Sequence, residues 1–199
     1  MTYGSLLQER RRTLHARVVE AIERLDPDRL DEQAERLAHH AVKGELWEKA
    51  VGYLRQAGAR AFGRSANREA AAFFEQALPL LSRLPESRER LELAVDLRFD
   101  LRNALQMLGQ FEQAIPFVRE AERIAQTLHG PRRVGLVSAY LSWYSWVTGH
   151  SVDALRFARE VLSSAGESQL AYLGRHTISS HDLSSSRPLT RSVDCLRSI

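Results

Sequence analysis

The chain has 199 residues, of which 44% are hydrophobic and 27% are charged, and its formal net charge is +3. This length suits one domain or one short repeat array, and so small a net charge does not by itself indicate nucleic-acid binding. The single cysteine, Cys195, cannot form an intrachain disulfide, and no apolar run approaches the ~20 residues of a membrane span. We therefore expect a soluble, cytoplasmic protein that binds neither nucleic acid nor membrane.

The elements expected before Gly166 are helices, because Ala, Leu, Arg and Glu dominate and apolar residues recur every three or four positions. No segment alternates β-branched and polar residues convincingly enough to predict a strand. Short breaks are expected at 25–31, 43–45, 64–67, 84–87, 108–110, 129–131 and 148–151. Asp28, in the first break, is expected to cap the following helix. Short turns between long helices predict antiparallel neighbours.

The first helix carries a run of three arginines, Arg10 to Arg12. The run winds around the helix and does not form a stripe, and Glu9 offsets part of its charge. An exposed face, or an interface with another domain, is therefore favoured over nucleic-acid binding.

The stretch GARAFGRS, residues 58–65, differs from the phosphate-binding loop G-x-x-x-x-G-K-[ST] only at Arg64. That loop needs a preceding strand, whereas the preceding residues here are helical in pattern. We interpret Gly58 as a close contact between helices, and Gly63 to Asn67 as a turn.

Four segments resemble one another: WEKAVGYLRQA (47–57), NREAAAFFEQA (67–77), FEQAIPFVREA (111–121) and SVDALRFAREV (151–161). The fourth position is always alanine, at Ala50, Ala70, Ala114 and Ala154. The eighth is Leu54, Phe74, Val118 or Ala158, and the eleventh is Ala57, Ala77, Ala121 or Val161. Small residues at such positions let two helices approach closely, so we expect these faces to be helix contacts.

This pattern resembles the second half of a tetratricopeptide repeat, and GQFEQAIPFVREA is its best copy. The resemblance covers about residues 31–165 and implies an all-α, right-handed α-solenoid of antiparallel helical hairpins. The spacing of the alanines is uneven, and segment 46–64 is expected to serve both as the second helix of one hairpin and as the first helix of the next.

The N-terminal part carries a second set of residues in a recognisable arrangement. They are Arg11, Arg12, Leu14, His15 and Arg17, then Leu37, Ala38, His40, Ala50, Tyr53, Leu54, Ala57 and Gly58. This arrangement is similar to the junction after the ATPase core in bacterial signalling ATPases, which include ATPases linked to adenylate/guanylate cyclase domains and relatives of the maltose-regulon activator. The resemblance implies a regulatory, non-catalytic portion of such a protein, without its ATP-binding core or cyclase domain.

We expect three regions: an N-terminal helix over 1–30, the tetratricopeptide-like repeats over 31–165, and a tail over 166–199. The tail is rich in serine and is interpreted as a degenerate fifth hairpin or a disordered segment.

No catalytic, metal or cofactor site is expected. His39 and His40 are adjacent, so they point to different sides of a helix, while His176, His181 and Asp182 suggest at most weak metal binding. The carboxylates alternate with arginines in the manner of solvated helix faces. We expect a protein that is not an enzyme by itself.

The tetratricopeptide register places eight residues in a groove that would bind a protein or peptide partner. They are Glu35, His39, Arg55, Phe99, Asn103, Gln106, Trp143 and Trp146. The favoured functions are a stand-alone interaction module and the regulatory tail of a signalling ATPase or cyclase; a nucleotide-using enzyme is the third hypothesis. The partner and the oligomeric state stay open.

Overall fold

The computed structural model describes residues 3–128 and 131–164, and these form helices and turns without a strand. The all-α class expected from the sequence is confirmed for this part of the chain. The chain divides into two compact units, residues 1–128 and 129–199. No helix within the described ranges is both long enough and apolar enough to cross a membrane.

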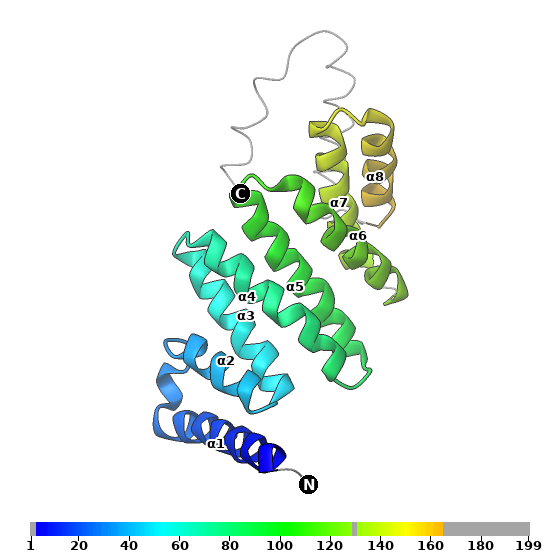
Figure 1. The fold of residues 1–199 in the computed structure, drawn as a ribbon. Helices are drawn as coiled ribbons and strands as arrows, with labels where there is room; N and C mark the ends of the chain where they lie inside the picture. Colours follow the sequence, from blue (N-terminus) through cyan, green and yellow to red (C-terminus); the bar gives the residue numbers. More distant parts are fainter. Residues whose placement is uncertain (1–2, 129–130, 165–199) are drawn as a thin grey trace. The chain divides into compact units, whose positions relative to one another are not determined.

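Six α-helices and two 3-10 turns make up the described part of the first unit (Figure 1). The helices are α1 (Tyr3–Leu25), α2 (Ala34–Lys43), α3 (Trp47–Gly63), α4 (Asn67–Leu80), α5 (Arg88–Met107) and α6 (Phe111–Thr127), with 3-10 turns at Pro27–Arg29 and Leu81–Arg83. Each helix packs against the next one in the chain, and α3 also contacts α5. Packing between sequence neighbours is typical of helical-repeat proteins.

The described part of the second unit is a pair of packed helices, α7 (Pro131–Val147) and α8 (Ser151–Ser164). Small residues of α7, among them Ser138 and Ser142, are fully buried. The hydroxyl of Ser142 donates to the carbonyl oxygen of Ala154 at 3.0 Å, and that of Ser138 donates to Glu160 Oε2 at 3.0 Å. These hydrogen bonds satisfy hydroxyl groups that would otherwise be costly to bury.

Four turns of three residues share one backbone geometry: 44–46, 64–66, 108–110 and 148–150. The middle residue has a positive φ each time: Glu45 56°, Ser65 62°, Gly109 72° and Gly149 83°. The next N–H bonds a carbonyl five residues earlier, at 2.7 to 2.9 Å: Leu46 to Ala41, Ala66 to Ala61, Gln110 to Leu105 and His150 to Ser145. This is the Schellman motif, which satisfies carbonyl groups at the end of a helix. Helices that are joined so closely and pack together run antiparallel.

The repeated alanine follows each of these turns by four residues. Ala50, Ala70, Ala114 and Ala154 are at most 1% exposed. The eighth and eleventh positions of the four segments, Leu54, Phe74, Val118, Ala158, Ala57, Ala77, Ala121 and Val161, are at most 2% exposed. The expectation that these faces are buried is confirmed. Helix α3 packs against both α2 and α4.

Substitutions at two equivalent turn positions, Ser65 and Gly109, are expected to change stability in opposite directions. Ser65→Gly should raise the free energy of unfolding by about 1 kcal/mol, because glycine adopts a positive φ without steric cost. Gly109→Ala should lower it by about 1 kcal/mol, since a Cβ there meets no atom within 4 Å and only the backbone strain remains. Urea unfolding at unchanged m-value measures both. A change of the same sign in both variants would contradict this account of the turns.

The residues that mimic a phosphate-binding loop lie in α3 as far as Gly63, and the chain turns at 64–66. Gly58 is buried against Phe74 of α4: a Cβ built on Gly58 would lie 2.8 Å from two ring atoms and closer still to a third. The interpretation as a helix contact followed by a turn is confirmed.

The expected cap at Asp28 is wrong. Asp28 lies in the first 3-10 turn, and the residue that precedes α2 is Gln33, whose side chain makes no capping hydrogen bond. Additional turns at 30–33 separate Asp28 from the helix, which the local sequence pattern did not indicate. The boundaries 1–30 and 31–165 stay predictions. The tail over 166–199, with His176, His181, Asp182 and Cys195, lies outside the described residues.

Candidate interaction surface

An ion-pair network joins α3 to α5 at Arg55. Arg55 Nε donates to Asp100 Oδ2 at 2.8 Å, and Arg55 Nη1 lies 3.6 Å from Asp96 Oδ2. The three side chains are about one-third exposed, so they are partly screened by solvent and contribute modestly to stability. They link α3 to α5 at this point.

Half-buried residues continue along the same face of α5. Phe99, Asn103 and Gln106 follow Asp96 at intervals of three or four residues, so they lie on one side of the helix. The guanidinium of Arg102 lies 5.2 Å from the centre of the Phe99 ring, and its Nη1 donates to Gln106 Oε1 at 3.2 Å. The α3–α5 surface, as we call it, consists of Arg55, Asp96, Phe99, Asp100, Asn103 and Gln106.

Four of the eight residues predicted to bind a partner are thus brought together. They are Arg55, Phe99, Asn103 and Gln106. The sequence reasoning missed Asp96 and Asp100, which hold Arg55, and Arg102, which covers Phe99. Carboxylates at i and i+4 on the face of α5 that carries Phe99 were a signal that could have identified them.

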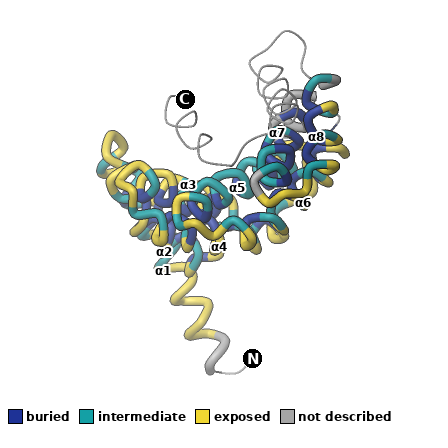
Figure 2. Tube along the Cα trace, turned by 90° about the horizontal axis from the view of Figure 1, so that it is seen from above, coloured by how far each residue is buried: buried dark blue, intermediate teal, exposed yellow. Residues whose placement is uncertain are grey.

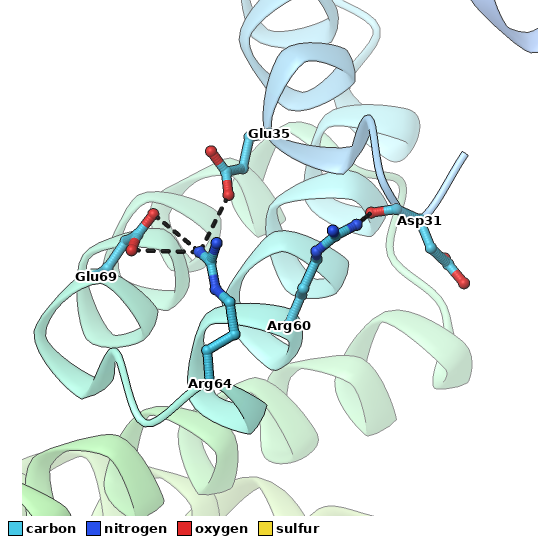
Figure 3. A network of polar contacts seen from close by, with 5 residues as sticks. All are labelled: Asp31, Glu35, Arg60, Arg64 and Glu69. Carbon is cyan, nitrogen blue, oxygen red and sulfur yellow. Dashed lines mark hydrogen bonds and ion pairs between the residues drawn. The ribbon is translucent and has the colours of Figure 1, made fainter. Parts of the chain in front are cut away.

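Glu35 belongs to a different network, at the ends of α2, α3 and α4 (Figure 3). Arg64 Nη2 lies 3.4 Å from Glu35 Oε1 and 3.3 Å from Glu69 Oε1, and Arg60 donates to the carbonyl oxygen of Asp31 at 2.9 Å. Figure 3 shows the guanidinium of Arg64 between the two carboxylates. The arginine that stands where a phosphate loop has lysine is therefore engaged by two acidic side chains.

His39 belongs to a cluster of three histidines where α1 meets α2. His15 Nδ1 lies 2.8 Å from His40 Nδ1, and the His39 ring is centred 6.1 Å from His15 and 5.3 Å from His40. His40 therefore packs at the interface between α1 and α2. In the part of the chain that the structure describes, no group of three or more metal-binding side chains is arranged to hold an ion.

The pKa of His40 is lowered from its ordinary value of 6.5, first by burial and then by the nearby charges of His15, His39 and Arg36. Protonation of His40 therefore costs more free energy in the folded state than in the unfolded state. Stability from this interface is complete above about pH 6.5 and falls as the pH drops below it.

The thermal midpoint should therefore decrease between about pH 7.5 and about pH 5, and His40→Gln should reduce that decrease. A glutamine keeps a hydrogen-bonding side chain beside His15 but has no proton to take up. Differential scanning calorimetry of both proteins across this range measures the difference. Equal pH dependence in the two proteins would show that His40 is not the responsible group.

Trp143 and Trp146 lie in the second unit, on α7. The Tyr140 ring is centred 5.7 Å from that of Trp143 and 6.4 Å from that of Tyr144. Tyr140 is buried, whereas both tryptophans are half-buried. Trp143 thus forms part of an aromatic cluster within its own unit.

No protein-family model matches the chain, and no curated protein matches it. Among solved structures, the chain is similar to the crystal structure of BtubC (BKLC) from P. vanneervenii. The sequences are 18% identical, the likeness covers 92% of this chain and 95% of that one, and the TM-score is 0.54. At this identity the likeness concerns the helical fold alone.

Proposed function

We propose that the chain is a non-catalytic protein-interaction module, built as a right-handed, tetratricopeptide-like α-solenoid. The observation that carries the proposal is the recurrence of one turn and one buried alanine in four places along the chain. Repeated hairpins build long surfaces suited to binding an extended peptide or a helix.

The α3–α5 surface is the proposed binding site. Phe99 offers an aromatic group of the kind that anchors partners, and it is already placed by Arg102 above it. Around it, Asn103 and Gln106 carry amide groups able to donate and accept hydrogen bonds, while Arg55 is held by Asp96 and Asp100. A side chain held in place before binding loses less conformational entropy when the partner arrives.

The similarity of the N-terminal residues to signalling ATPases supports a regulatory role for this module, in the cytoplasm, next to a catalytic domain elsewhere. A stand-alone adaptor is the alternative, and the source cell's genome separates the two. In the first case the reading frame, or its neighbour, encodes a phosphate-binding loop in a true strand–loop–helix context.

The experiment is affinity capture from the source cell, followed by measurement with the purified partner. Phe99→Ala should weaken binding of the captured partner at least tenfold, as expected of an anchor residue. Gln76→Ala, an exposed position on α4, is the matched control and should bind as the wild type does. Thermal unfolding of both variants excludes loss of fold as the cause.

Two results would count against this function. The first is a partner whose affinity does not respond to Phe99→Ala. The second is tight, magnesium-dependent ATP binding that is lost on Arg64→Ala, which would support the nucleotide-using enzyme instead.

A further inference from the structure

Helix α1 is anchored at its C-terminal half. Val19 and Ile22 are buried in a cluster with Leu37 and Ala41, and Glu23 accepts hydrogen bonds of 2.6 Å from Lys49 and from Tyr53. Residues 6–14, in contrast, are exposed around the whole helix. Figure 2 shows this N-terminal end of α1 as an exposed segment that extends away from the other helices of the first unit.

A seam of residues, all apolar except Arg11, runs along α1 beside the anchored face. The seam consists of Leu7, Arg11, Leu14, Val18, Ala21 and Leu25, whose spacings alternate between four and three residues. That alternation is the a/d pattern of a coiled coil. Leu7, Leu14 and Leu25 are 47%, 60% and 78% exposed, and four of the six exposed large hydrophobic residues in the described ranges lie on α1.

Arginines follow one edge of the seam with the same period. Arg10, Arg17 and Arg24 are spaced by seven residues and occupy the g position, which flanks the seam of a coiled coil. All three are exposed, and none of them forms an ion pair with any described residue. Arg10 and Arg17 also line a shallow groove with Leu6, Glu9, Thr13 and Leu14.

Beside the C-terminal half of α1, the opposite edge of the seam is occupied by the protein's own helices. Its e positions are Gln8, His15 and Ile22; His15 contacts His40 of α2, and Ile22 is buried. Along this C-terminal half, where Gln8 plays no part, a further helix can therefore approach only from the edge that carries the arginines.

We propose that α1 pairs along this seam with an acidic amphipathic helix of a partner protein, whose leucines pack against Leu7, Leu14 and Leu25 and whose carboxylates meet Arg10, Arg17 and Arg24. Opposite charges at the flanking positions determine partner choice in coiled coils. This site is separate from the α3–α5 surface, and the proposal stands without the proposed function.

The arginines of α1 argue against a second copy of the chain as the helix that binds the seam. An antiparallel pair would place g positions against one another, arginine facing arginine, and a parallel pair would bring Arg11 of each copy together in the seam. A lipid surface is also disfavoured, because the apolar seam is narrow and Arg11 interrupts it, whereas interfacial helices present a broad apolar face.

The probe is a fluorescent synthetic peptide of about four heptads with leucine at a and d and glutamate at e and g; a second peptide carries lysine at e and g. Fluorescence anisotropy should show that the chain binds the glutamate peptide at least tenfold more tightly than the lysine peptide. The triple variant Arg10→Glu, Arg17→Glu, Arg24→Glu should reverse that preference, a gain of binding that misfolding could not produce.

Leu14→Gln should weaken binding of the glutamate peptide at least tenfold. Met107→Gln is the matched control, because Met107 is an equally exposed apolar residue at the end of α5, and it should leave binding unchanged. Failure to bind either peptide, equal binding of both, or a triple variant without reversed preference would overturn the proposal. So would dimerisation of the chain through Leu14 in analytical ultracentrifugation, or Leu14-dependent binding to anionic phosphatidylglycerol vesicles without peptide binding.

Discussion

Gly58→Ala is expected to lower the free energy of unfolding by about 2 kcal/mol, although alanine favours helix more than glycine does. The added methyl group would overlap the ring of Phe74, which is 2% exposed and has no room to withdraw. Overpacking of this kind costs about 1–3 kcal/mol and outweighs the gain in helix propensity of about 1 kcal/mol. Chemical denaturation with an unchanged m-value measures the loss.

Gly52→Ala is the matched control within the same helix. Gly52 is exposed, and a Cβ there meets no atom within 4 Å, so this variant should be more stable by about 1 kcal/mol. Adding Phe74→Leu to Gly58→Ala should recover part of the loss, because the shorter side chain makes space for the methyl group. If Gly58→Ala stabilised the protein as Gly52→Ala does, the close packing of α3 on α4 would be refuted.

The second large effect is expected at a repeated alanine. Ala114→Leu should destabilise the chain by about 1–3 kcal/mol, because Ala114 is fully buried on α6, which packs against α5. Gln113→Leu, at the preceding exposed position, adds a side chain of the same size in solvent and should change stability by less than about 0.5 kcal/mol. Thermal and urea unfolding compare the two variants. Equal effects at both positions would mean that α5 and α6 do not approach closely at the repeated alanine.

For the candidate surface, the sequence predicted which residues share a helix face but not which helices those residues contact. The spacing of Phe99, Asn103 and Gln106 was enough to place them on one face of α5, because helical periodicity is local. The separation of Glu35 from Arg55 could not be anticipated, because each side chain is held by residues distant in sequence: Glu35 by Arg64, and Arg55 by Asp96 and Asp100.

The cluster of histidines illustrates the same limit. His39 and His40 were expected, as adjacent residues, to point to different sides of a helix. Their environment depends on His15, which lies more than twenty residues away and reaches them only because α1 packs against α2. Gly44 permits this approach, since a Cβ there would lie 2.9 Å from the backbone nitrogen of Ala16.

By itself, the sequence determined the helical class, the sites of the turns and the buried face of each repeated segment. These follow from interactions over a few residues: the helical period of apolar side chains, and the breaks that precede each repeated alanine. Only the tertiary structure decided that Ser65 and Glu45 adopt the same positive φ as two glycines, and that Phe74 fills the space left by Gly58. It also decided that Arg10, Arg17 and Arg24 form no ion pair with any described residue, whereas Arg12 pairs with Glu45. Those features depend on which helices pack against one another. Residues far apart in the chain determine that packing, through the fit of their side chains and through their charges.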